Sequence, residues 1–208
     1  MDRVIALLLC VPLVACRDRG RPPASGHGQP AETAGAFPGA PAAADTAALR
    51  AYTVAVDSLA EGAGEELYAV VNGQLVPVPD EASWPDLAEA RIHLLRAADG
   101  SPRRHVEIPV SESGDWSVAA VHYFDREGRT VGFALEASWF NSGCTEVLRD
   151  FRFMLYDPTF RRKLEERRYL DAAGQPRDTV GCVNPYQFDR GAFSSYGSLA
   201  AAGLAPAR

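Results

Sequence analysis

The sequence lacks the features that most directly assign a function. It has no basic excess: 21 lysines and arginines are outnumbered by 27 aspartates and glutamates, which gives a formal net charge of −6. Nucleic-acid binding needs a basic surface that displaces counterions, so this balance argues against a nucleic-acid partner. The apolar run at residues 4–14 is far shorter than the roughly 20 residues that a transmembrane helix needs.

Catalytic and cofactor motifs are also missing. The four histidines form neither an HExxH motif nor a His-x-His pair, and there is no GxSxG elbow, phosphate-binding glycine loop or dinucleotide fingerprint. The acidic turn at residues 111–116 lacks the regular spacing of a cation loop. Glu107, Glu112 and Asp115 could act as an acid–base pair, but 27 carboxylates supply such pairs by chance. We therefore expect no cofactor and no metal site, and we name no catalytic residue.

The first sixteen residues have the organisation of an export signal. A short polar start precedes the apolar run at residues 4–14, and Ala15 leads into Cys16. Such a run has the length of the apolar core of a signal peptide. The sequence Leu-Val-Ala-Cys at residues 13–16 resembles the lipobox of bacterial lipoproteins, in which the cysteine is linked to diacylglycerol and the chain is cleaved in front of it.

This resemblance implies a lipoprotein signal peptide at residues 1–15, lipidation of Cys16, and an exported protein attached to the membrane by its N-terminal lipid. In that family an aspartate directly after the cysteine favours retention in the inner membrane. Arg17 stands at this position, which implies delivery to the outer membrane in an organism with two membranes. The alternative is an ordinary cleaved signal peptide in which Cys16 is incidental.

Composition divides the rest of the chain into three parts. Residues 16–45 are rich in Pro, Ala and Gly and contain a single large apolar residue, Phe37. Such a segment buries too little surface to offset its ordering entropy, so we interpret it as a flexible tether. Residues 46–199 have the size of one globular domain, and residues 200–208 are predicted to be a frayed tail.

A helix and a hairpin are predicted at the start of the domain. Asp45 or Thr46 can cap a helix whose apolar residues recur at i, i+3/i+4 spacing. These residues are Ala48, Leu49, Tyr52, Ala55, Val56 and Leu59. Asn72-Gly73 between two apolar runs is the strongest short hairpin signal, because both central residues of a type I′ turn have positive φ. Pro77 lacks an amide donor, which puts the returning strand at a sheet edge or near its end.

The middle of the domain has the periodicity of an antiparallel hairpin. Residues 116–124 and 129–140 flank a turn at residues 125–128. In the second run, the larger apolar side chains stand at every second position and the smaller or polar ones stand between them, as a half-buried strand requires. A similar turn at residues 171–174 indicates a repeated hairpin unit.

Two segments, residues 83–98 and 161–170, fit either a helix or a strand. We favour strands from about Ala90 and through 161–170, because helix propensity is a weak prior that strand pairing overrides. The predicted fold class is α+β, mainly β. It consists of a single antiparallel, twisted or curled meander sheet with one N-terminal helix packed on it.

Cysteine usage agrees with export. Of four cysteines, Cys10 lies in the signal peptide and Cys16 is the lipidation site, so the domain keeps only Cys144 and Cys182. In an oxidising compartment such a pair forms a disulfide, which we predict here to fasten the aromatic segment 184–196 to the sheet. The alternative is a nucleophilic Cys144 with His105 or His122 as its base, although the spacing provides no positioned base.

Aromatic residues in the second half suggest a binding surface. The candidate ligand-binding residues are Trp116, Trp139, Phe140, Tyr186 and Phe188. Exposed rings of this kind bind sugars or peptides. The alternative is structural: Trp116 and Trp139 belong to the core, and residues 184–196 cross a sheet edge.

The sequence leaves three functional hypotheses. We favour a non-catalytic envelope lipoprotein, a binding or accessory module that contacts an envelope protein or a cell-wall partner. The alternatives are a small envelope hydrolase with an unrecognised site and a carrier of a lipid or other hydrophobic ligand. A deep pocket with convergent carboxylates or histidines would favour the hydrolase, an exposed aromatic patch the module, and an enclosed apolar cavity the carrier.

Overall fold

The computed structural model describes residues 39, 45–61, 64–186, 188 and 190–207. The predicted signal peptide at residues 1–15, the lipidation site Cys16 and nearly all of the tether at 16–45 lie outside these residues. The described residues all belong to one compact unit, residues 34–208.

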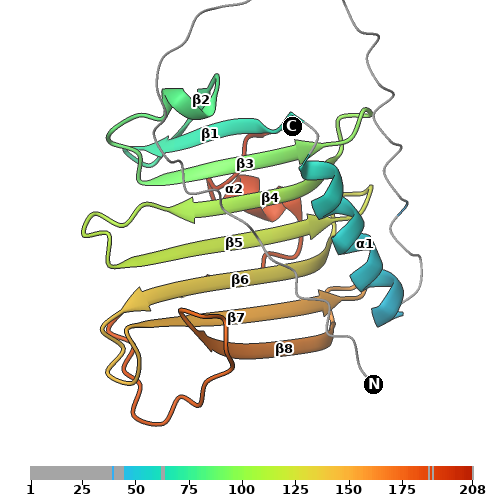
Figure 1. Ribbon diagram of the computed structural model, residues 1–208. Helices are drawn as coiled ribbons and strands as arrows, with labels where there is room; N and C mark the ends of the chain where they lie inside the picture. The colour runs from blue at the N-terminus through green and yellow to red at the C-terminus, as the bar shows by residue number, and fades with distance from the viewer. Residues whose placement is uncertain (1–38, 40–44, 62–63, 187, 189, 208) are drawn as a thin grey trace, which may run out of the picture. The chain divides into compact units, whose positions relative to one another are not determined.

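The domain is built on one open antiparallel sheet of eight strands (Figure 1). The strands are β1 (Glu66–Val71), β2 (Gln74–Val78), β3 (Ala90–Arg96), β4 (Pro102–Pro109), β5 (Trp116–Phe124), β6 (Thr130–Phe140), β7 (Val147–Tyr156) and β8 (Arg162–Asp171). Their spatial order is β2-β1-β3-β4-β5-β6-β7-β8, so β2 and β8 are the two edges. The predicted mainly-β antiparallel sheet is confirmed. One departure from a simple meander is that β3 pairs with β1, which leaves β2 on the outside.

Turn chemistry explains the first hairpin. Asn72 and Gly73 have φ values of 51° and 71°, as the predicted type I′ turn requires. Pro77 lies in the edge strand β2, where the missing amide donor interrupts no second ladder.

Four further turns share one backbone pattern. In each, the first amide donates to the carbonyl of the fifth residue and the fourth amide donates back to the first carbonyl; the turns span residues 97–101, 125–129, 157–161 and 171–175. The fourth residue always has positive φ, and it is Gly100, Gly128, Phe160 and Gly174 in turn. Phe160 offsets this unfavourable conformation by stacking on Tyr156, with ring centroids 4.4 Å apart.

Both ambiguous segments contain strands. Residues 90–96 form β3, preceded by a short 3₁₀ turn, η1 (Glu81–Ser83), and residues 162–171 form β8. In β8 the register places Leu164 opposite Leu155 of β7. Pairing along nine residues of β7 outweighs the local helix propensity of this charged segment.

The helix α1 (Thr46–Ala60) begins at the predicted cap, where the Asp45 side chain accepts a hydrogen bond from the Ala47 amide. A narrow stripe of α1, including Leu49, Tyr52 and Val56, is buried in a cluster with residues of the sheet. Contact with β6 is very close at one point, because a Cβ on Gly132 would lie only 2.8 Å from Cγ2 of Thr53.

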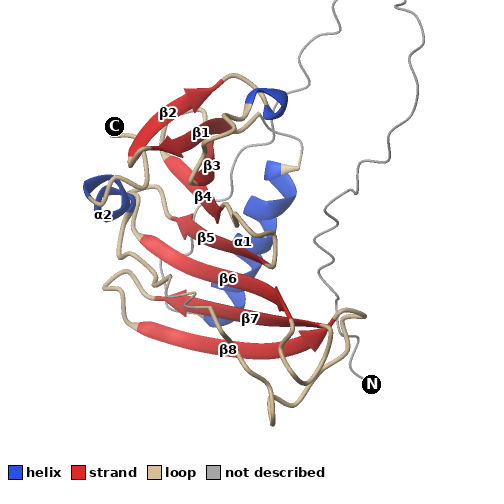
Figure 2. Cartoon of the chain, turned by 90° about the vertical axis from the view of Figure 1, so that its left-hand side faces the viewer, coloured by secondary structure: helices blue, strands red, loops and turns tan. Residues whose placement is uncertain are grey.

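The C-terminal segment is here residues 182–207, and its described residues lie on the face of the sheet opposite α1 and include a second helix, α2 (Tyr196–Ala201) (Figure 2). The prediction of a frayed tail at residues 200–208 is wrong for the described part. Ala205 is 3% exposed, and the Leu204 carbonyl accepts a hydrogen bond from His105. The tail is ordered because Leu199 and Ala205 bury apolar surface against Phe124.

Candidate functional site

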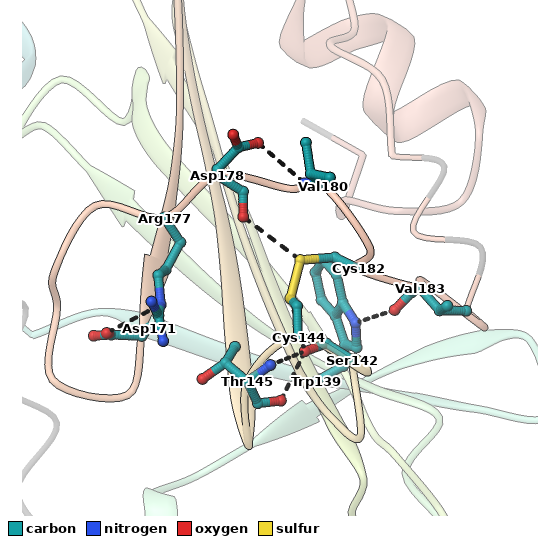
Figure 3. The surroundings of a disulfide bond; sticks show 10 residues. All are labelled: Trp139, Ser142, Cys144, Thr145, Asp171, Arg177, Asp178, Val180, Cys182 and Val183. Atoms are coloured by element: carbon teal, nitrogen blue, oxygen red, sulfur yellow. Dashed lines mark hydrogen bonds and ion pairs between the residues drawn. A yellow bond between two sulfur atoms is a disulfide. The ribbon is translucent and has the colours of Figure 1, made fainter.

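The predicted disulfide between Cys144 and Cys182 is confirmed (Figure 3). It joins the β6–β7 loop to the start of the C-terminal segment across a sequence separation of 38 residues. The Val183 amide donates to the Ser142 carbonyl, and Nε1 of Trp139 donates to the Val183 carbonyl at 3.0 Å. Because Cys144 is bonded to Cys182, it has no thiolate and cannot serve as the nucleophile of the alternative hypothesis.

From this anchor the C-terminal segment crosses a face of the sheet. The Val183 carbonyl accepts a hydrogen bond from Trp139 of β6. Further along the segment, the Phe193 amide donates to Nε2 of His122 in β5. The Phe193 carbonyl accepts a hydrogen bond from the Thr130 hydroxyl. The interpretation that residues 184–196 cross a sheet edge is therefore wrong: the described residues Tyr186, Phe188 and Phe193 lie against β5 and β6, which are central strands.

An aromatic groove forms where this segment meets the ends of β4 and β5. Its volume is about 480 Å³, within the range of small-ligand sites. It is lined by Pro109, Trp116, Val118, Pro185, Tyr186, Phe188 and Arg190. The rings of Trp116 and Phe188 lie 5.8 Å apart, and Tyr186 lies 6.4 Å from Trp116 and 5.7 Å from Phe188. The groove thus has a continuous wall of three aromatic side chains.

The groove also has polar groups. Nη2 of Arg190 lies 3.2 Å from Oε1 of Glu107, and the exposed fractions of the two side chains are 44% and 5%. Burial raises the pKa of the Glu107 carboxyl, although the positive charge of Arg190 acts in the opposite direction. Next to the rings, the Tyr186 hydroxyl donates to Oδ2 of Asp115 at 3.0 Å, which orients the tyrosine ring.

The structure separates the five predicted aromatic residues into two groups. Trp116, Tyr186 and Phe188 line the groove. Trp139 is 2% exposed and lies beneath Phe188 at 5.5 Å, so it supports the groove from the core. Phe140 is 45% exposed but is not among the lining residues.

Sequence reasoning missed the polar partner Arg190 and the two prolines of the groove wall. It considered Glu107 and Asp115 only as carboxylates that could face each other by chance. Alternation along β4 and β5 places Glu107 and Trp116 on the same face, but this signal is useful only when the pairing of Glu107 with Ala120 is known.

His105 and His122, the bases of the alternative nucleophile hypothesis, lie in the core. His105 and His122 are 0% and 2% exposed, on neighbouring strands. Nε2 of His105 donates to the Leu204 carbonyl at 2.8 Å, whereas Nε2 of His122 accepts from the Phe193 amide at 3.1 Å. Burial lowers the pKa of His105 to about 4 and that of His122 to about 3. Both rings are neutral at pH 7 and bind the backbone of the C-terminal segment.

A second polar cluster lies beside α1. Asp57 accepts from the Tyr123 hydroxyl at 2.8 Å and pairs with Arg104 at 3.0 Å, and Arg104 also pairs with Glu65, which contacts His93. Burial raises the pKa of Asp57 despite the charge of Arg104. Burial would also raise the pKa of Glu65, but the hydrogen bond from His93 and the charge of Arg104 outweigh it and lower that pKa. These groups compensate one another, so we interpret the cluster as a structural link between helix and sheet.

Two general properties complete the site description. Within the described part of the chain, no three His, Cys, Asp or Glu side chains come together in a way that could hold a metal ion. Among the same residues, every helix is too short or too polar to span a bilayer.

Comparisons with protein-family models, with curated proteins and with solved structures found no match to this chain. The protein is therefore described by its structure alone. It is an open antiparallel sheet with a C-terminal segment anchored by a disulfide, and an aromatic groove lies between the sheet and this segment.

Proposed function

We propose that this protein is a non-catalytic binding module of the bacterial envelope, held at the membrane by lipid on Cys16, whose ligand site is the aromatic groove. The observation that carries the proposal is the wall of Trp116, Tyr186 and Phe188 in a groove of about 480 Å³. Trp116 lies on the central strand β5, and the disulfide anchors the segment of the other two rings. A site on such rigid supports loses little entropy when a ligand binds.

The two alternative functions have weaker support. For a hydrolase, the histidines that could act as bases are packed in the core and bound to the C-terminal backbone. For a hydrophobic carrier, the sheet does not curl into a closed container, because β2 and β8 remain separate edges. An exposed groove with aromatic and polar walls is the arrangement typical of a binding module.

The lipid anchor follows from the lipobox resemblance and can be tested directly. Cys16→Ser should shift the protein from the membrane fraction to the soluble fraction or leave the precursor uncleaved, since no sulfur remains to carry diacylglycerol. Fractionation and mass spectrometry of the N-terminus measure this change. An unmodified mature N-terminus in the wild-type protein would refute lipidation.

The assignment of the groove as the ligand site can be tested on the full-length protein in mild detergent. Retention on envelope fragments from its own host should fall at least tenfold in Trp116→Ala and in Tyr186→Ala, because truncation of an anchoring aromatic residue typically costs about 2 kcal/mol or more. Phe140→Ala is the matched control: it removes an exposed aromatic residue outside the groove and should leave retention unchanged. Equal losses in all three variants, or no retention of the wild type, would contradict the proposal.

A further inference from the structure

The chemistry of the groove narrows the class of ligand. Its apolar wall is not a parallel stack: Trp116 is inclined by 49° to Tyr186 and by 57° to Phe188. These rings line a groove of about 480 Å³, so their faces and edges form its apolar wall. A pyranose ring carries C–H groups on one face and packs them against an aromatic face, so a sugar chain fits a surface of this kind.

The polar groups match hydroxyl groups. A sugar hydroxyl both donates and accepts hydrogen bonds, and it therefore pairs best with a site that offers both. Arg190 offers guanidinium donors on the groove wall, and its separation of 3.2 Å from Glu107 is longer than a close charge-assisted bond. Behind the lining residues, Glu107 pairs with Arg190 and Asp115 accepts from the Tyr186 hydroxyl, whose oxygen can still accept a hydrogen bond from a sugar.

The charge balance favours a neutral ligand. Arg190 is the cationic side chain among the lining residues and pairs with the carboxylate of Glu107, and a second carboxylate, Asp115, accepts from the lining residue Tyr186. The negative charge of these two carboxylates behind the wall would repel an anionic ligand, and a cationic ligand would be repelled by Arg190. A proline-rich peptide would pack on the rings, but its prolines carry no N–H donors, so it would pair with fewer of the polar groups of the groove.

We propose that the aromatic groove binds a neutral saccharide chain, with its sugar rings against Trp116, Tyr186 and Phe188 and its hydroxyl groups on the Arg190 guanidinium and the Tyr186 hydroxyl. This inference rests on the proposed function of the groove as the ligand site. It names the chemical class of the ligand and assigns Arg190 the role of hydrogen-bond donor.

The test uses the full-length protein in mild detergent and three neutral oligosaccharides, the β-1,4-linked tetramers of N-acetylglucosamine, glucose and mannose. At least one should bind with a Kd in the range of about 10 µM to 1 mM by calorimetry. Trp116→Ala and Arg190→Met should each weaken binding at least tenfold. Trp116→Phe should restore part of the affinity, and Phe140→Ala should leave it unchanged. Circular dichroism melts confirm that each variant is folded.

The outcomes separate the inference from the proposed function. Binding that Trp116→Ala and Arg190→Met leave intact would place the saccharide elsewhere and overturn the inference. If none of the three tetramers binds while retention on envelope fragments still depends on Trp116, the groove is a ligand site for another class and the saccharide is wrong. A proline-rich peptide that binds in place of the sugars leads to the same conclusion. If no tetramer binds and retention on envelope fragments does not depend on Trp116, both the saccharide inference and the proposed function are contradicted.

Discussion

Removing the disulfide should lower the free energy of unfolding by about 4 kcal/mol. The bond closes a loop across a sequence separation of 38 residues, and the chain-entropy relation assigns this magnitude to the freedom that the unfolded chain regains. Cys144→Ser and Cys182→Ser should be destabilised alike. The free energy of unfolding of the double variant should be little lower than that of either single variant, because the first substitution already breaks the disulfide.

Urea denaturation of the three variants measures the loss, and a reducing agent supplies the control. Reductant should destabilise the wild-type protein to the level of the double variant and leave the double variant itself unchanged. Saccharide affinity should fall along with stability, since Tyr186 and Phe188 follow Cys182 in the segment that the bond anchors. Additive losses in the double variant would mean that the cysteines contribute by packing and not through their bond.

Acidification should produce the second large effect, through His105 and His122. Their pKa values in the folded protein are about 4 and about 3, whereas an unperturbed histidine titrates near 6.5. The unfolded chain therefore binds protons first as the pH falls. The contribution of the two neutral histidines to stability is present above about pH 6.5 and is lost as the pH falls toward their folded pKa values, with about 2 kcal/mol lost from each histidine between pH 7 and pH 5.

The surroundings of the two rings explain why protonation is unfavourable. His122 lies among Phe124, Phe133 and Phe193, and its Nε2 already accepts the Phe193 amide, so a proton there would break that bond. The rings of His105 and His122 are 6.1 Å apart, and the two charged forms would repel each other. The C-terminal segment should thus be released early in acid unfolding.

Urea midpoints at pH 7 and pH 5 test this prediction in a His105→Gln/His122→Gln variant. Glutamine offers an amide donor for Leu204 and an amide oxygen for Phe193 but does not titrate, so the variant should lose most of the difference between the two pH values. His93→Gln serves as the control, because its partly exposed ring contacts Glu65 beside α1, away from the C-terminal segment, and it should keep the difference. An unchanged pH dependence in the double variant would assign the acid sensitivity to the carboxylates.

Short-range patterns in the sequence determined most of the secondary structure. The Asn72-Gly73 pair and the turns that end at Gly128 and Gly174 fix hairpins because a residue with positive φ is needed at each site, and this requirement is local. Alternation in β6 identifies a strand for the same reason, although α1 also buries its first four residues on the other face. The disulfide followed from elimination, since Cys144 and Cys182 are the cysteines left in the domain.

Tertiary structure alone decided the rest. Only the register brings Glu107 to the end of the sheet that carries Trp116, and only the route of the C-terminal segment places Arg190 beside them. That route depends on Leu199 finding an apolar site against Phe124 far away in the sequence. No local pattern records which buried surface a distant segment will cover. The sequence therefore determined the strands and the disulfide, whereas long-range burial of apolar surface created the groove.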